Sequence, residues 1–249
     1  RTEGPSDIAF SDDGLTVFTT NLRRAMNGLE FSQNRLERPF DVLSDSVRAE
    51  PGGTCDDVDG LDVNALSGGA LNDKTEDIDF AKNGMIFFIM ADFGQLGKFN
   101  ATKPFDVDGL TYSGNRIVLG GPVDSVEFSR DGTKFFALNS TNNDPVLKTY
   151  NIPGDYDIAS ATEIQSINLE DYGVIDTADE NENAQDFEFN SDGSALFVLI
   201  RNSTDDSNSW IYQFSLSKNY DVSTAKKVGR FSLTNIFLNR DSGDRSGIP

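Results

Sequence analysis

Carboxylates are the side chains of this sequence that could do chemistry. The chain contains 41 Asp and Glu residues and no histidine. Without histidine, the commonest general base and the commonest metal ligand are missing, and so is any Ser-His-Asp or Cys-His arrangement. The GxGxxG and P-loop motifs of nucleotide-binding proteins and the GxSxG motif of hydrolases are absent as well. The remaining catalytic candidates are therefore carboxylates.

Two sets of carboxylates occupy the same positions in four similar segments, which run from residues 7 to 18, 77 to 88, 125 to 136 and 186 to 197. Three segments begin with Asp7, Asp77 and Asp186, and three have an acid directly before their first Phe, namely Asp79, Glu127 and Glu188. Carboxylates that converge near one axis would suit glycoside hydrolysis, which needs an acid and a nucleophile or base. Residues repeated at one position more often serve the structure, by capping a loop or lying hydrated in a channel. We therefore expect no catalytic residue among them.

Calcium is the cation that the acidic loops would favour. Asp57, Asp59 and Asp62 in the sequence DVDGLD resemble the first half of an oxygen-ligand loop, and Asp106 and Asp108 repeat the DxDG pattern. Neither stretch has the distal Glu of an EF-hand, and so many acids produce DxDG matches by composition alone. We expect no metal and no cofactor, with calcium at the Asp57 loop as the open alternative.

Other residues carry weaker signals. Cys55 is the single cysteine, so no intramolecular disulfide can form, and the acids beside it would raise its thiol pKa and make it a poor nucleophile. Three glycosylation sequons, at Asn100, Asn139 and Asn202, are about as many as the composition gives by chance. The one basic cluster, interpreted as a solvated strand edge with pairing to a neighbouring copy as the alternative, consists of Arg23, Arg24, Arg35 and Arg38.

The four segments also share a pattern that predicts their structure. A first Phe is followed four residues later by Gly and eight residues later by a second Phe: Phe10, Phe80, Phe128 and Phe189, then Gly14, Gly84, Gly132 and Gly193, then Phe18, Phe88, Phe136 and Phe197. Glycine suits the φ > 0 of a tight turn, and the preceding Asp13, Asn83, Asp131 and Asp192 tolerate or cap such a turn. Each segment is therefore predicted to be a β-hairpin. Across the aligned segments the first Phe residues form one column and the second Phe residues another, and we expect the two Phe columns to face the same layer.

A second block follows each hairpin, at residues 31–42, 99–107, 150–158 and 214–222. Each block contains an aromatic-Asp-Val/Ile turn, which we expect to be capped by Asp41, Asp106, Asp157 or Asp221. One unit then holds four antiparallel strands in roughly 45 residues, which is typical of a β-propeller blade. The sequence predicts an all-β chain of four such blades.

The blade boundaries follow from these blocks. We place blade 1 at about residues 6–50, a loop at 51–75, blade 2 at 76–120, blade 3 at 123–170, a loop at 171–184, blade 4 at 185–233 and an inter-blade tail at 234–249. The final SGIP resembles the GPSDI that leads into the first hairpin, so we expect a further repeat to follow. The chain would then belong to a longer propeller of about six to eight blades or to a tandem array, with a closed four-bladed ring as the less common alternative.

The charge narrows the choice of partners. With 21 basic and 41 acidic residues the formal charge is −20, so nucleic acid and anionic membrane surfaces would repel the chain. A hydrophobic content of 37% predicts a folded, soluble protein. The longest apolar run, residues 85–91, has the length of a strand and is too short to span a membrane.

At these repeats the chain resembles the propeller repeats of bacterial, archaeal and phage surface proteins, many of them marine. Their blades read approximately F-S-x-D-G-x-x-x-F followed by Y-x-L-S-x-x-Y-D-V-S-T-A, and the closest copy here is residues 189–197 with residues 211–225. The resemblance covers most of the chain and implies an extracellular or virion protein with no assigned chemistry. The sialidase Asp-box S-x-D-x-G-x-T-W is similar too, but Gly14 stands one position early after Ser11 and Asp13, so a sialidase assignment does not follow.

We therefore expect a non-catalytic interaction or assembly module of a secreted, cell-surface or virion protein. Its function would lie in the loops at residues 50–76 and 171–184. Its partner would be a protein, a carbohydrate or further copies of the chain. The alternative is an enzyme, either a carboxylate-dependent glycoside hydrolase or a metal-dependent lactonase-like propeller.

Overall fold

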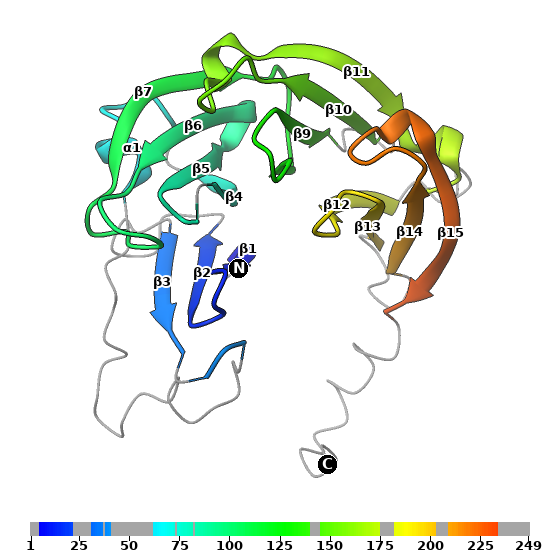
Figure 1. The fold of residues 1–249 in the computed structure, drawn as a ribbon, viewed down its shortest axis with the longest axis horizontal. Coiled ribbons are helices and arrows are strands. Elements are labelled where there is room, and N and C mark those ends of the chain that lie inside the picture. The colour runs from blue at the N-terminus through cyan, green and yellow to red at the C-terminus, as the bar shows by residue number, and fades with distance from the viewer. Residues whose placement is uncertain are drawn as a thin grey trace.

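Four antiparallel β-sheets stand side by side around a common axis and form an open arc (Figure 1). The computed structural model describes residues 5–21, 31–36, 38–40, 62–72, 74–81, 83–139, 145–174, 182–202 and 209–233. In each sheet the strands follow one another in chain order, from the axis outward. The all-β architecture of propeller-like blades is therefore confirmed, and the four sheets that the structure describes do not close into a ring.

The first two sheets correspond to blades 1 and 2. Blade 1 contains β1 (Pro5–Phe10), β2 (Thr16–Asn21) and β3 (Phe31–Arg35). Blade 2 contains β4 (Thr75–Ala81), β5 (Ile86–Ala91), β6 (Gln95–Asn100) and β7 (Thr111–Val118). The residues in which a fourth strand of blade 1 was expected, 41–50, lie outside the described part of the chain.

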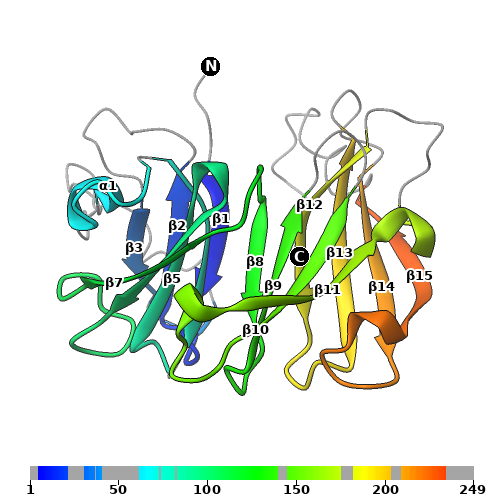
Figure 2. The same cartoon turned by 90° about the horizontal axis from the view of Figure 1, so that it is seen from above.

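The last two sheets have four strands each. Blade 3 contains β8 (Ser125–Phe128), β9 (Lys134–Asn139), β10 (Val146–Asn151) and β11 (Thr162–Asn168). Blade 4 contains β12 (Glu182–Phe189), β13 (Ala195–Asn202), β14 (Trp210–Leu216) and β15 (Ala225–Ser232). The inner strands β1, β4, β8 and β12 are neighbours in that order and run along the axis (Figure 2).

Short helices lie in two of the three connections between the described sheets. The predicted loop at 51–75 contains α1 (Val63–Leu66), and the predicted loop at 171–184 overlaps the 3₁₀ turn Leu169–Tyr172 and the start of β12. Residues 51–61, 175–181 and the predicted tail 234–249 lie outside the described residues. None of the helices in the described part has the length and apolar character needed to span a membrane.

The Phe columns build the layers between blades. In blade 1, Phe10 pairs with Val17 and Ala9 pairs with Phe18, so the two column residues point to opposite faces of their own sheet. Each layer instead joins the second Phe of one blade to the first Phe of the next, with ring centroids 4.8 Å apart for Phe18 and Phe80. The corresponding centroid separations are 3.6 Å for Phe88–Phe128 and 4.6 Å for Phe136–Phe189. A first Phe and a second Phe therefore share a layer only when they belong to neighbouring blades, and not within one hairpin as the sequence predicted.

The hairpin glycines are required for two reasons. Gly14, Gly84, Gly132 and Gly193 all have φ between 67° and 76°, where side chains are strained. The aromatic residue of the second block lies directly over each glycine: a Cβ on Gly193 would come closer than 3.0 Å to the ring of Tyr220. The same holds for the other three pairs, Gly14–Phe40, Gly84–Phe105 and Gly132–Tyr156. The two sequence blocks of a blade therefore form one packed unit.

Aspartates cap the turns as expected. The carboxylate of Asp131 accepts hydrogen bonds from the Thr133 N–H (3.0 Å) and from the Ser129 hydroxyl (2.7 Å), and Asp13 and Asp192 accept the equivalent N–H groups in their turns. In the second turns, Asp106 accepts from the N–H of Asp108, and Asp221 accepts from Ser223. Asp157 accepts hydrogen bonds from Ser160 in its own turn and from the side chain of Asn115, whereas Asp41 lies outside the described residues.

Candidate functional site

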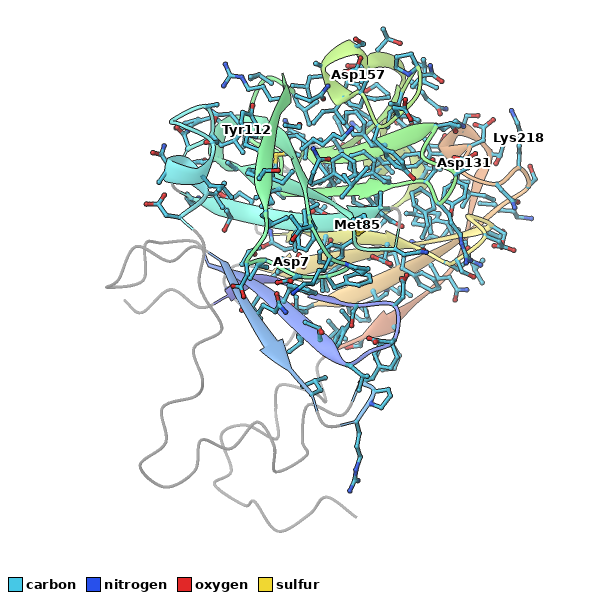
Figure 3. The ribbon with its side chains drawn as sticks, turned by 60° about the vertical axis from the view of Figure 1, so that its left-hand side comes forward. Asp7, Met85, Tyr112, Asp131, Asp157 and Lys218 are labelled. Carbon is cyan, nitrogen blue, oxygen red and sulfur yellow. The ribbon has the colours of Figure 1, made fainter. Side chains whose placement is uncertain are left out.

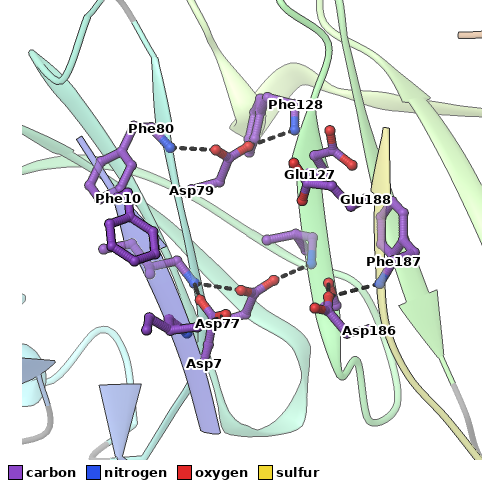
Figure 4. A pocket seen from close by; sticks show the side chains of 15 residues that line it. Asp7, Phe10, Asp77, Asp79, Phe80, Glu127, Phe128, Asp186, Phe187 and Glu188 are labelled. Atoms are coloured by element: carbon purple, nitrogen blue, oxygen red, sulfur yellow. Dashed lines mark hydrogen bonds between the residues drawn. The ribbon is translucent and has the colours of Figure 1, made fainter. Parts of the chain in front are cut away.

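The four inner strands line a cavity of about 420 Å³ on the axis (Figure 4). All six repeated carboxylates line it: Asp7, Asp77, Asp79, Glu127, Asp186 and Glu188. These side chains therefore converge near the axis. They converge because each blade begins with its innermost strand. The two acidic positions lie two residues apart on that strand, so their side chains point to the same face.

The cavity carboxylates link each blade to the next. The Asp79 carboxylate of blade 2 accepts a hydrogen bond from its neighbour Phe80 (N–O 2.6 Å) and another from the N–H of Phe128 in blade 3 (2.7 Å). Asp77, two residues earlier on the same strand, likewise accepts hydrogen bonds from the N–H of Ile78 (2.7 Å) and from the N–H of Val126 in blade 3. These bonds satisfy backbone donors on the free edge of an inner strand, which faces the axis and has no strand partner in its own sheet.

The same linkage recurs, incompletely, at the other two interfaces. From blade 1 to blade 2, Asp7 accepts from the N–H of Ile78 at 3.3 Å, and Ala9 stands where the second acceptor would be. From blade 3 to blade 4, Glu127 accepts from the N–H of Phe189 at 2.8 Å. Ser125 occupies the first acceptor position there, and its hydroxyl donates to Asp186 at 2.7 Å. Each interface thus keeps at least one carboxylate that binds the next blade.

Burial and mutual repulsion raise the pKa values of several carboxylates in this cluster. Burial raises the pKa of Asp79 from 3.8 to about 7, and the two N–H groups on its carboxylate oppose that shift. Burial also raises the pKa of Asp77 well above its ordinary value, with repulsion from Asp7 and a hydrogen bond to it adding to the effect. The pKa of Glu127 is raised mainly by burial and then by repulsion from Glu188. Near neutral pH the cluster therefore retains protons, and its members titrate together.

Glu188 differs from the other acids of the cavity. It lies in blade 4, at the end of the arc, where its side chain stays exposed and accepts no hydrogen bond from the described residues. Although Glu188 keeps contact with solvent, it loses part of its surrounding water in the cavity, and this raises its pKa to about 7, with further contributions from Asp79, Asp186 and Asp7. An acid with such a pKa could donate or accept a proton near neutral pH.

A second hollow of about 650 Å³ continues the cavity toward the hairpin turns. It shares Asp79, Glu127 and Glu188 with the first and adds residues that the sequence did not single out as site residues, above all Arg130. The aromatic rings that cover the turn glycines, including Tyr156 and Tyr220, form part of its wall. Their repeated aromatic-Asp-Val/Ile motif was the signal in the sequence that could have placed them there.

Among the calcium candidates, the structure describes only Asp62, Asp106 and Asp108, and none of these lines the cavity. Asp57 and Asp59, and also Cys55, lie outside the described residues. Asp62 caps α1 by accepting from the N–H of Ala65 at 2.7 Å, and Asp106 forms an ion pair with Lys103 at 3.5 Å. In the described ranges, no three Asp, Glu or Cys side chains are grouped so that they could hold a metal ion.

The remaining predicted residues lie on the strands and outer turns. The sequons Asn100, Asn139 and Asn202 are the last residues of β6, β9 and β13. Of the basic cluster, Arg35 ends β3 and Arg38 follows it, whereas Arg23 and Arg24 lie outside the described residues. Figure 3 shows that the second-block Asp157 lies well away from Asp7 at the axis, so the turn aspartates and the cavity carboxylates form separate sets.

Comparisons with known proteins bear on the fold. No protein-family model matches the sequence, and no curated protein matches it. Among solved structures, the chain is similar to the hydrazine synthase of Kuenenia stuttgartiensis, with a TM-score of 0.53 and 14% identity over 93% of this chain and 49% of that chain. It is also similar to a candidate 6-phosphogluconolactonase of Bacteroides uniformis, with a TM-score of 0.51 and 17% identity over 91% of this chain and 56% of that chain.

A third similar structure is a protein from Lactobacillus plantarum, with a TM-score of 0.53 and 12% identity over 92% of this chain and 57% of that chain. At such identities the likeness concerns the fold alone. The chain spans about half the length of these solved structures. We conclude that the described residues form an arc of propeller-like blades whose axis is lined by shared carboxylates.

Proposed function

We propose that this chain is a non-catalytic β-propeller module that mediates interaction or assembly in a secreted, cell-surface or virion protein. The observation that carries the proposal is the use of the cavity carboxylates. Asp77, Asp79 and Glu127 each direct an oxygen at a backbone N–H of the next blade. A nucleophile or base must be able to reach a substrate, and oxygens held in this way serve the structure instead.

The choice of partner and location has separate support. Function on a propeller scaffold lies in the loops and faces that the blades present, and the net charge of −20 disfavours nucleic acid. The location outside the cell rests on the resemblance of the repeats to those of surface and virion proteins. A protein, a carbohydrate or further copies of the chain fit such a module.

A turnover assay tests the proposal. Purified wild type, Asp79→Asn and Glu188→Gln are incubated with a panel of chromogenic glycosides and small lactones, with and without added divalent cations. We expect every rate to equal the uncatalysed background. Asp171→Asn, which removes an exposed carboxylate outside the cavity, is the matched control. A turnover that wild type and this control share, and that Glu188→Gln loses, would overturn the proposal.

One observation favours the second candidate, a carboxylate-dependent hydrolase. Glu188 combines an exposed side chain in the cavity with a pKa raised to about 7, which suits a general acid. Its neighbour Glu127 would then be the second carboxylate of the pair. The same assay decides between the candidates, because a glycosidase of this kind loses its rate in Glu188→Gln and shows a bell-shaped pH profile.

A further inference from the structure

The hairpin turn of blade 2 differs from the other three hairpin turns. In blades 1, 3 and 4 the residue before the turn glycine is an aspartate, namely Asp13, Asp131 and Asp192, whereas blade 2 has Asn83 before Gly84. Asn83 has φ 55° and Gly84 has φ 76°, and none of the three aspartates has a positive φ. Two successive positive φ values are those of the central residues of a type I′ turn, which an Asn-Gly pair favours. The turn of blade 2 therefore has a backbone geometry that the other turns lack.

This geometry leaves the N–H of Gly84 without an acceptor among the described residues. In the other turns the glycine is the fourth residue of the turn, and its N–H donates to the carbonyl of the first, from Gly132 to Ser129 at 2.8 Å and from Gly193 to Asn190 at 2.9 Å. In a type I′ turn the glycine is a central residue, and the hydrogen bond that closes the turn does not use its N–H. Accordingly, no described carbonyl or side chain accepts a hydrogen bond from the Gly84 N–H.

The side chain of Asn83 is not held in place either. In blade 3 the carboxylate of Asp131 is held by the Ser129 hydroxyl (2.7 Å) and by the N–H and hydroxyl of Thr133 (3.0 and 2.8 Å). Ala81 stands at the position of this serine in blade 2, and the side chain of Asn83 forms no hydrogen bond with the described residues. Asn83 is exposed and lines the second hollow. Its amide carbon can therefore turn toward the next main-chain nitrogen without breaking a hydrogen bond.

We propose that Asn83 is a site of spontaneous deamidation in the folded chain. Hydroxide removes the proton of the Gly84 N–H, and the nitrogen attacks Cγ of Asn83. The new C–N bond closes a five-membered succinimide ring, and the Cγ–Nδ2 bond breaks as Nδ2 takes up a proton and leaves as ammonia. Water then opens the ring at one of its two carbonyl carbons, which gives aspartate or isoaspartate at position 83. Glycine favours ring closure because it has no side chain to obstruct the attack.

The two products differ in their consequences for the turn. Aspartate is the residue of the other three turns, where Asp13, for example, accepts the N–H of Leu15 at 3.0 Å. Isoaspartate lengthens the main chain by one carbon at a point where the ring of Phe105 lies directly over Gly84. Either product adds a negative charge to the wall of the second hollow.

Peptide mapping by mass spectrometry of the folded 249-residue chain, kept in mildly alkaline buffer, tests the inference. We expect the peptide that contains Asn83 to gain the mass difference between NH and O, with Asn83→Asp as the standard for the aspartate product. Asn115 is the internal control, because its amide donates to Asp157 and accepts from the N–H of Ala159, and an arginine follows it. A second Asn-Gly pair, residues 27–28, lies outside the described residues, and mapping separates it from the first.

Asp131→Asn is the matched variant, because it places an Asn-Gly pair in the blade 3 turn, where the N–H of Gly132 is bound. In the folded chain this pair should deamidate roughly tenfold or more slowly than Asn83, since hydrogen bonds must break first. In urea the two pairs should react at similar rates. Asp192→Asn provides the same comparison in blade 4 if circular dichroism shows that Asp131→Asn does not fold.

Two results would overturn the inference. One is an Asn83 that keeps its amide in the folded chain, and the other is an introduced pair that reacts as fast as Asn83 in a folded variant. Both results are independent of turnover in the glycoside panel, which tests the proposed function.

Discussion

Raising the pH from about 5 to about 8 should destabilise this protein through Asp79. The carboxylate has a folded-state pKa of about 7 and an ordinary pKa of 3.8, because burial disfavours its charged form. The folded state therefore keeps a proton that the unfolded state has lost. For an acid with a raised pKa, stability is greatest below the unfolded value and declines as the pH rises toward the folded value.

The magnitude follows from these two values. Proton linkage gives a loss in the free energy of unfolding of roughly 2 to 3 kcal/mol between about pH 5 and about pH 8 from this single group. In a chain of this size that loss corresponds to a fall in Tm of about 5 to 10 °C. Asp77 and Glu127 have pKa values raised in the same direction, so their contributions have the same sign.

Thermal melts followed by circular dichroism across this pH range measure the effect. Asp79→Asn removes the titrating group, so its Tm should fall less steeply with pH than that of wild type. Asp171→Asn removes one exposed negative charge and should melt in parallel with wild type, which separates the cavity from the general repulsion of a chain with charge −20. A wild-type Tm that rises with pH, or an Asp79→Asn slope equal to that of wild type, would refute the reasoning.

Three further outcomes are expected. Phe88→Ala, which empties the fully buried layer between blades 2 and 3, should cost about 3 to 5 kcal/mol in a urea titration, whereas Phe93→Ala at a 66% exposed site should cost little. Gly193→Ala and Gly120→Ala impose the same strain at φ 71°, but only the first meets an aromatic ring, so it should cost roughly 2 to 4 kcal/mol against about 1 kcal/mol for the second. EDTA and excess calcium should give the same Tm, and a higher Tm with calcium would instead assign a ligand role to the acidic loops.

The sequence predicts the hairpins and the residues of the inner strands well, because both depend on patterns between residues that are close in the sequence. The spacing of Phe10, Gly14 and Phe18 fixes a hairpin, and the position of Asp77 at the start of its unit puts it on the inner strand. What the carboxylates bind could not be read from the sequence. The N–H that Asp79 binds in the next blade lies 49 residues away, and an N–H group carries no signature of its own in the sequence.

The sequence also did not predict the sheet faces to which the two Phe of a hairpin point. The two Phe of a hairpin lie eight positions apart, but the register pairs Ala9 with Phe18, so Phe10 and Phe18 point to opposite faces of the sheet. The pairing register depends on the turn geometry, in which Gly14 has φ 68°. Only the three-dimensional arrangement shows that each layer takes its two rings from different blades.

The incomplete repeats themselves favour a structural role for the cavity carboxylates. Catalysis by a carboxylate pair requires two particular acids, and losing either one removes the activity. Here Ala9 replaces the second acceptor at one interface and Ser125 the first at another, yet both interfaces keep one hydrogen-bonded carboxylate and a fully formed Phe layer. Such substitutions are tolerable when two acceptors share the task of holding neighbouring blades together.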